Sequence, residues 1–152
     1  MQLREVVATD VPRVVALVRE TLAEFGLEFG KGAVTDDQLF ALPGSYTAAG
    51  GAFFVAEAGG ELCGTAGVAP VGEGVFELRK MYLAKAARGR GAGAQLLAAC
   101  VAHCRARGAK RLVLDTTEKM TAAIAFYEKH GFVRDDAQVR GARCSRGYRL
   151  DL

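Results

Sequence analysis

The stretch that decides the fold runs from residue 78 to residue 97 and reads LRKMYLAKAARGRGAGAQLL. Its first part predicts a strand that ends near Leu83, and its last part, from Gln95, predicts a helix. Between them lies a glycine cluster, Arg88 to Gly93, which reads RGRGAG. Glycines let successive backbone N–H groups turn toward one concavity, and the following helix adds unpaired amides and the positive end of its dipole. The cluster therefore predicts a phosphate or pyrophosphate site, with Arg88 and Arg90 adding charge beside it.

Other phosphate-binding loops fit this stretch poorly. The P-loop pattern needs Gly-Lys-Ser or Gly-Lys-Thr, and neither occurs in the chain. The dinucleotide pattern can be placed on Gly89, Gly91 and Ala94, but residues 84–88 separate it from its strand and an antiparallel meander precedes it. A plain glycine-rich turn with solvated arginines is the remaining alternative.

Working outward, hydrophobic periodicity and turn residues predict alternating strands and helices along the chain. Gly59-Gly60 predicts a hairpin turn, and Gly131 a helix stop. The predicted strands are 3–8, 52–58, 61–71, 75–83, 111–116, 132–135 and 144–152, and the predicted helices are about 10–24, 36–42, 95–108 and 121–130. The order β-α-α-β-β-β-α-β-α-β-β indicates one mixed α+β domain over residues 1–152.

Composition excludes several classes of protein. The chain has 152 residues, 51% of them apolar and 24% charged, which is typical of a folded globular domain. A net charge of +3 argues against a nucleic-acid partner. No apolar run is long enough to span a membrane and no signal peptide is visible, so we expect a cytoplasmic protein. We therefore expect free cysteines, with Cys100 and Cys104 as buried thiols rather than metal ligands.

Two motifs in order resemble the signature of the GCN5-related N-acetyltransferase (GNAT) family. The family pattern [QR]-x-x-G-x-[GA] is matched by Arg88, Gly91 and Gly93, and residues 123–132, AIAFYEKHGF, resemble the A-x-x-x-Y-E-K-x-G-F run of the second motif. The resemblance covers nearly the whole chain and is weak over residues 25–51. It implies the acyl-CoA N-acyltransferase fold, a central, mostly antiparallel twisted sheet flanked by helices. It also implies an acetyl-CoA-dependent N-acetyltransferase that needs no metal.

The resemblance also implies which residues bind acetyl-CoA. The glycine-rich loop carries the pyrophosphate, and the strand before it pairs with the pantetheine arm. Met120 stands where many relatives have asparagine, so an apolar contact is expected there. The expected binding residues are Met81, Tyr82, Leu83, Arg88, Gly89, Arg90, Gly91, Ala92, Gly93, Ala94, Met120, Ala123 and Phe126.

Attack of an amine on a thioester requires a base, a donor to the oxyanion and an acid for the departing thiolate. The resemblance implies that the Tyr127 hydroxyl faces the coenzyme sulfur, where a phenol can donate to a thiolate. A backbone N–H at Met81 or a neighbour is expected to hold the oxyanion. Glu77 is the candidate base; the alternative is a solvated strand-end carboxylate or an ion-pair partner of Arg79. His103 and His130 titrate in a suitable range but fit less well.

The resemblance places the acceptor between two variable segments. Residues 25–46 mix acidic and aromatic side chains, which suits a cationic amine, and residues 134–147 are rich in arginine, which suits a carboxylate. Solvated loops are the alternative for both. We therefore expect a small amine or an amino-acid-like acceptor. A protein, peptide or aminoacyl-tRNA acetyltransferase and a non-catalytic CoA-binding sensor are the alternatives, and a homodimer is left open.

Overall fold

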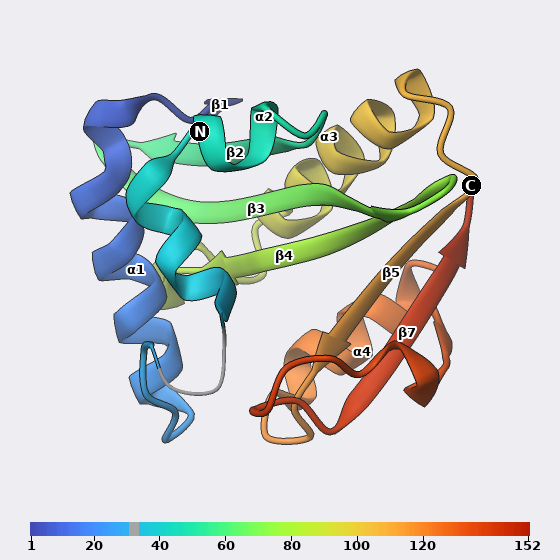
Figure 1. Ribbon diagram of the computed structural model, residues 1–152. Coiled ribbons are helices and arrows are strands. Elements are labelled where there is room, and N and C mark those ends of the chain that lie inside the picture. The colour runs from blue at the N-terminus through green and yellow to red at the C-terminus, as the bar shows by residue number, and fades with distance from the viewer. Residues whose placement is uncertain (31–33) are drawn as a thin grey trace.

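A computed structural model describes residues 1–30 and 34–152. Seven strands form one twisted sheet in the order β1-β2-β3-β4-β5-β7-β6, flanked by helices (Figure 1). The strands are β1 (Gln2–Glu5), β2 (Ala52–Ala58), β3 (Glu61–Gly72), β4 (Val75–Leu83), β5 (Arg111–Thr116), β6 (Val133–Arg134) and β7 (Arg146–Asp151). The α-helices are α1 (Val11–Glu24), α2 (Gly44–Thr47), α3 (Ala92–Ala106) and α4 (Thr121–Lys129), and the 3-10 helices are η1 (Ala8–Asp10), η2 (Val34–Ala41), η3 (Lys85–Ala87) and η4 (Asp136–Gln138).

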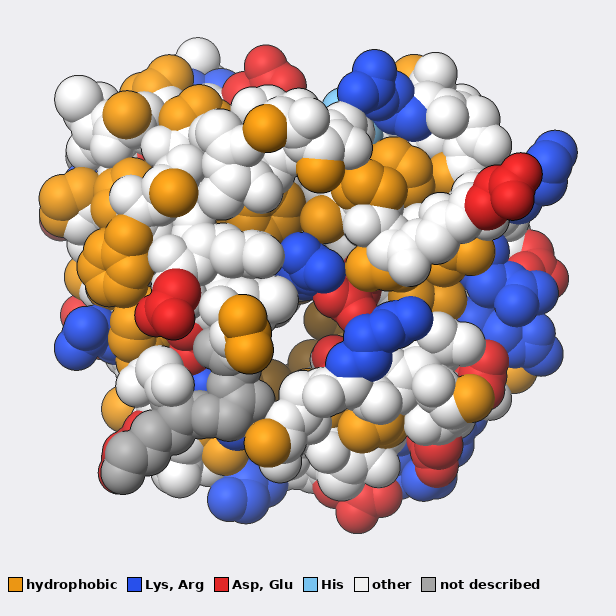
Figure 2. Space-filling model, in the orientation of Figure 1, with side chains coloured by type: hydrophobic (Ala, Val, Ile, Leu, Met, Phe, Trp, Pro, Cys, Tyr) orange, Lys and Arg blue, Asp and Glu red, His pale blue; other side chains and the backbone are white. Residues whose placement is uncertain are grey.

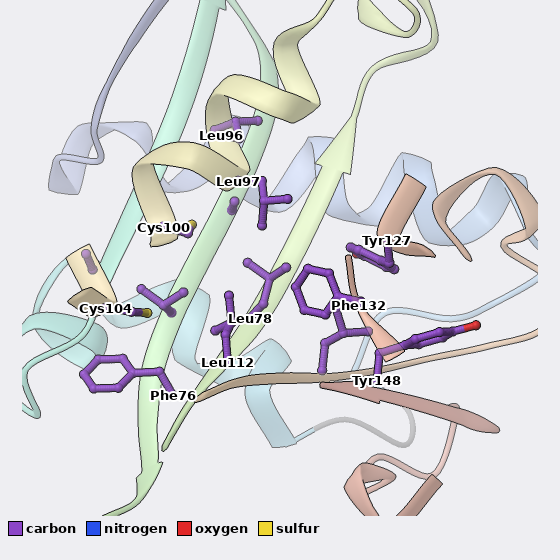
Figure 3. Close-up of a cluster of buried hydrophobic side chains, with 14 of the residues drawn as sticks. Phe76, Leu78, Leu96, Leu97, Cys100, Cys104, Leu112, Tyr127, Phe132 and Tyr148 are labelled. Atoms are coloured by element: carbon purple, nitrogen blue, oxygen red, sulfur yellow. The ribbon is translucent and has the colours of Figure 1, made fainter. Parts of the chain in front are cut away.

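The two faces of the sheet bury separate hydrophobic cores because neighbouring side chains of a strand point to opposite faces. Ala56 of β2 belongs to the core under α3 and α4, which includes Leu96 and Ile124. Its neighbour Val55 belongs to the core under α1 and η2, with Val14 and others. Figure 3 shows the first core, to which Cys100 and Cys104 of α3, Leu112 of β5 and Tyr127 of α4 all contribute.

The predicted α+β class and the order of the strands and main helices are confirmed. The short helix α2 was not predicted, because residues 44–47 lie in a segment read as loop, and most other differences lie at element ends. Helix α3 begins at Ala92, three residues before the predicted Gln95, because Gly91 is its N-cap. The last strand begins at Arg146 rather than Cys144, and the first ends at Glu5 rather than Ala8. The helix predicted at 36–42 is the 3-10 helix η2. Within the described residues, no helix is long and apolar enough to cross a membrane.

The sheet opens on one side between β4 and β5. These parallel strands pair only over three positions, from Val75–Arg111 to Glu77–Val113, and then diverge (Figure 1). All the other strand pairs in the described part of the chain are antiparallel. The remainder of β4, from Leu78 to Leu83, therefore faces an opening, and this opening positions the site.

Candidate active site

The larger cavity, of about 650 Å³, lies in the opening between β4 and β5. It is walled by β4 and β5, by parts of the segment from Leu27 to Asp37, and by the loop from Arg140 to Cys144. Figure 2 shows a hollow on this face with basic and acidic side chains around its opening. Both predicted acceptor segments therefore contribute to one cavity; residues 31–33 lie outside the described residues.

A smaller cavity, of about 240 Å³, adjoins the larger one. It runs between β4 and α4 toward the glycine-rich loop, and Leu83, Gly89, Gly93 and Phe126 lie in its wall. Five residues line both cavities and so mark where they meet: Met81, Tyr82, Met120, Ala123 and Tyr127. Each of these five residues was predicted from the sequence, four of them as cofactor-binding residues and Tyr127 as catalytic.

The glycine-rich loop has the backbone that an anion site needs. Gly91 has φ 84°, a left-handed conformation that side chains disfavour, and it caps the N-terminus of α3. Gly93 serves a different purpose, because a Cβ there would lie 3.3 Å from Phe126 Cε1. Its missing side chain lets α3 and α4 approach closely beside the smaller cavity. Arg90 and Ala94 are exposed, and Ala92 is buried.

Arg88 closes the side of the smaller cavity. Its guanidinium donates to both carboxylate oxygens of Glu24 on α1, at 2.6 and 3.1 Å, and to the Leu83 carbonyl at 3.0 and 3.2 Å. It thus joins the loop to the end of α1 across the cavity. The contact with Glu24 also neutralises part of the positive charge of Arg88, which the sequence analysis expected to lie beside the pyrophosphate.

A β-bulge interrupts β4 where it passes the cavities. Gly67 of β3 pairs with Arg79 and Thr65 pairs with Tyr82, so Lys80 and Met81 stand opposite Ala66 alone. Lys80 has φ 54°, which costs a lysine roughly 1–3 kcal/mol and needs support from its surroundings. Part of that support is a 2.7 Å hydrogen bond from the buried Thr65 hydroxyl to the Lys80 carbonyl. The bulge turns the Met81 region of the strand toward the junction of the two cavities, as its place in both linings indicates.

A buried ionic cluster lies behind the bulge. The Asp36 carboxylate of η2, fully buried, accepts from Lys80 Nζ and from Arg143 at 2.7 and 3.1 Å. The Gly30 amide adds a third donor at 2.6 Å. Sequence reasoning missed this cluster and treated Asp36 as one of several loop charges. Nothing in the sequence marks it, because its members lie 44 and 107 residues apart.

Tyr127 lies at the junction of the cavities, on α4. It is 7% exposed, and its ring packs against Phe132 and near Tyr148 (Figure 3). Burial raises the pKa of Tyr127 above its ordinary value of 10, so the hydroxyl keeps its proton at neutral pH. A neutral phenol at this position is suited to donate a hydrogen bond to a departing thiolate.

Glu77 lines the larger cavity near the divergence of β4 and β5 and is 5% exposed. Its carboxylate accepts from Arg79 Nε at 2.5 Å and from Arg140 at 3.0 Å. The ion pair with Arg79, which the sequence offered as the alternative to a catalytic base, therefore exists, and Arg140 adds a second one. Arg140 is about half exposed, so this arginine can move between the carboxylate and a ligand.

Cys144 also lines the larger cavity, beside Asp115. Burial and the neighbouring carboxylate raise the pKa of the Cys144 thiol to about 12. A thiol this weakly acidic is poorly suited to form a covalent acyl intermediate at neutral pH. All four cysteines are free, as predicted, with Cys100 and Cys104 buried.

Other candidates from the sequence lie away from the cavity linings. His103 Nε2 contacts the Gly50 carbonyl at 2.9 Å, and His130 Nδ1 contacts the Phe126 carbonyl at 2.8 Å. Three of the arginines of the C-terminal segment pair with acidic side chains elsewhere: Arg134, Arg146 and Arg149. Among the residues that the structure describes, no group of three acidic, histidine or cysteine side chains is placed to hold a metal ion.

This fold and site define the class of protein. The family model of the acetyltransferase (GNAT) family matches residues 16–132, and the chain belongs to that family. It is an N-acetyltransferase by class. The uncharacterized N-acetyltransferase YjgM of Escherichia coli is 36% identical over 138 residues, which cover 88% of this chain and 83% of YjgM.

Solved structures support the fold. An acetyltransferase of the GNAT family from Staphylococcus aureus superposes with a TM-score of 0.90 at 21% identity, covering 99% of this chain and 98% of that one. A phosphinothricin acetyltransferase from Sinorhizobium meliloti, solved in complex with acetyl-CoA, gives 0.79 at 20% identity, covering 99% and 88%.

Proposed function

We propose that the protein transfers the acetyl group of acetyl-CoA directly to the primary amine of a small or amino-acid-like acceptor, with both substrates bound together. The observation that carries this proposal is the meeting of two cavities at Tyr127 and the β4 bulge. The smaller cavity takes the coenzyme and the larger takes the acceptor. The thioester then lies at their junction, where the reacting amine can reach it.

Acetyl-CoA suits the smaller cavity chemically. Its walls include Met81, Leu83, Met120 and Phe126, which present apolar surface to the pantetheine arm. At its end, the loop around Gly91 and the N-terminus of α3 offer backbone amides to the pyrophosphate. The acetyl-CoA complex of the Sinorhizobium enzyme, a protein of the same fold, supports acetyl-CoA as the ligand.

The reaction needs little rearrangement in this geometry. The amine nitrogen bonds to the thioester carbon after losing its proton to Glu77, directly or through water. A backbone N–H of the bulge at Met81 stabilises the oxyanion. As the C–S bond breaks, the Tyr127 hydroxyl donates to the sulfur of the departing coenzyme.

The larger cavity favours a small acceptor that carries both charges. Glu77 and Asp37 offer carboxylates to an ammonium group, while the half-exposed Arg140 offers a guanidinium to a carboxylate. The volume of the cavity, about 650 Å³, lies within the range of small-molecule sites.

A thiol-release assay with acetyl-CoA tests the proposal on three panels: small amines, free amino acids, and peptides with free amino groups. We expect turnover on small acceptors, and a KM for amino acids that rises in Arg140→Met but not in Arg134→Met, because Arg134 pairs with Asp136 outside the cavity. Turnover on peptides alone would favour a protein acetyltransferase. Binding of acetyl-CoA without turnover on any panel would favour a sensor.

A further inference from the structure

The buried cluster around Asp36 links three separate parts of the larger cavity. Asp36 belongs to η2, Lys80 to the bulge of β4, and Arg143 to the C-terminal loop. All three side chains are shielded from solvent, at 0%, 4% and 13% exposure. Burying such a contact costs much desolvation, so its contribution to stability alone is a weak reason for its presence.

Lys80 is anchored through both its side chain and its backbone carbonyl. Its side chain reaches Asp36, and its carbonyl accepts from the Thr65 hydroxyl at 2.7 Å. Between these contacts its backbone adopts φ 54°, which a lysine rarely adopts without constraint. The next residue is Met81, which lines both cavities. The direction of the Met81 N–H therefore depends on how Lys80 is anchored.

Asp36 accepts from both cations of the cluster, Lys80 and Arg143. Removing the Asp36 carboxylate therefore takes one partner from two shielded cations at once. Lys80→Met, by contrast, still leaves Asp36 paired with Arg143 and the Gly30 amide. Removal of the Asp36 carboxylate and Lys80→Met therefore both break the contact between Asp36 and Lys80, but Lys80→Met takes a partner from fewer buried charged groups.

We propose that Asp36 and Lys80 form a positioning pair that orients the oxyanion-binding N–H of the β4 bulge from the acceptor side of the site. This inference rests on the proposed function, which places the thioester carbonyl at the bulge. Asp36 touches neither substrate in this account and acts through Lys80. The pair adds a second anchor to the Thr65 hydrogen bond and explains how a lysine is held in a left-handed conformation.

The experiment uses acetyl-CoA labelled with ¹³C at the acetyl carbonyl, bound to the full chain without any acceptor. A hydrogen bond to the thioester oxygen polarises the carbonyl and displaces its ¹³C resonance, and it also lowers its infrared stretching frequency. We expect the parent protein to show the displacement and Lys80→Met to lose most of it, with the Kd for acetyl-CoA little changed. The matched control, Lys110→Met, removes an exposed lysine far along the chain and retains the full displacement.

Asp36→Asn provides a second variant and loses the displacement as well. With the best acceptor of the panels, kcat in Lys80→Met falls roughly 10- to 100-fold, somewhat less than for removal of an oxyanion donor outright. A loss of thermal stability with the carbonyl signal intact in either variant would overturn the inference and leave only a structural role. A parent that binds acetyl-CoA without any displacement would overturn it too, whereas a parent that binds no acetyl-CoA would refute the proposed function itself.

Discussion

Tyr127→Phe removes one hydroxyl from the junction of the two cavities and leaves the ring. The contacts of that ring with Phe126 and Phe132, at centroid distances of 5.8 and 5.6 Å, are retained. Since the ring also lines both cavities, the shape of the coenzyme site is preserved. The substitution therefore tests the role of the hydroxyl as a hydrogen-bond donor without changing the packing of the ring.

The size of the effect follows from the hydrogen bond lost. A hydrogen bond to a charged group is worth about 1.5–3 kcal/mol. That corresponds to a decrease in kcat of roughly 10- to 150-fold, since each 1.36 kcal/mol is a factor of ten. Because burial raises the pKa of Tyr127 above 10, the parent should show no loss of activity from this group at mildly alkaline pH.

A thiol-release assay measures kcat, and calorimetry measures the Kd of acetyl-CoA. We expect this Kd to change by less than about twofold, because the hydroxyl acts on the leaving thiolate rather than on the bound coenzyme. Tyr148→Phe is the matched control: its hydroxyl donates to Glu128 at 2.8 Å, outside both cavity linings, so the variant should lose stability but keep kcat. An unchanged kcat in Tyr127→Phe, or an equal decrease in the control, would refute the assigned role.

Glu77→Gln should lower kcat about 100-fold and flatten the limb of the pH–rate profile that rises with pH; a profile like the parent's would assign the base to water. Burial opposes ionisation of Asp36, but hydrogen bonds with its two cationic neighbours lower its pKa from 3.8 to about 2. The ionised Asp36 carboxylate therefore contributes about 2 kcal/mol to the free energy of unfolding above pH 4, and this contribution is lost as the pH falls toward 2. Urea unfolding at a series of pH values should show that Asp36→Asn lacks this loss of stability between pH 4 and pH 2. Gly93→Ala should press on the Phe126 ring and weaken acetyl-CoA binding several-fold by calorimetry, since a Cβ there lies 3.3 Å from that ring. Gly44→Ala, where a Cβ meets open space, should bind like the parent.

The fold could be predicted from the sequence because its signals are local. The hairpin glycines, the strand before the glycine-rich loop and the motif around Tyr127 each lie within a short stretch of chain. The start of α3 was placed late because Gly91 and Gly93 are poor helix formers in isolation. In the fold, Gly93 lies in the first helical turn, where close packing against Phe126 favours glycine.

The acceptor side of the site could be predicted only in outline. The two variable segments do line the larger cavity, but their individual charges have different roles. Asp36 is buried against Lys80 and Arg143 rather than solvated, and Arg140 reaches back to Glu77. These contacts join residues tens of positions apart, so no local pattern encodes them.

Initial-rate kinetics with acetyl-CoA and the best acceptor varied together test the central claim most directly. Direct transfer at the junction of two cavities requires both substrates to be bound at once. Direct transfer predicts double-reciprocal lines that intersect, with no acetyl label left on the protein when acceptor is omitted. Parallel lines, with label retained on the protein, would show a covalent acetyl-enzyme and contradict the account.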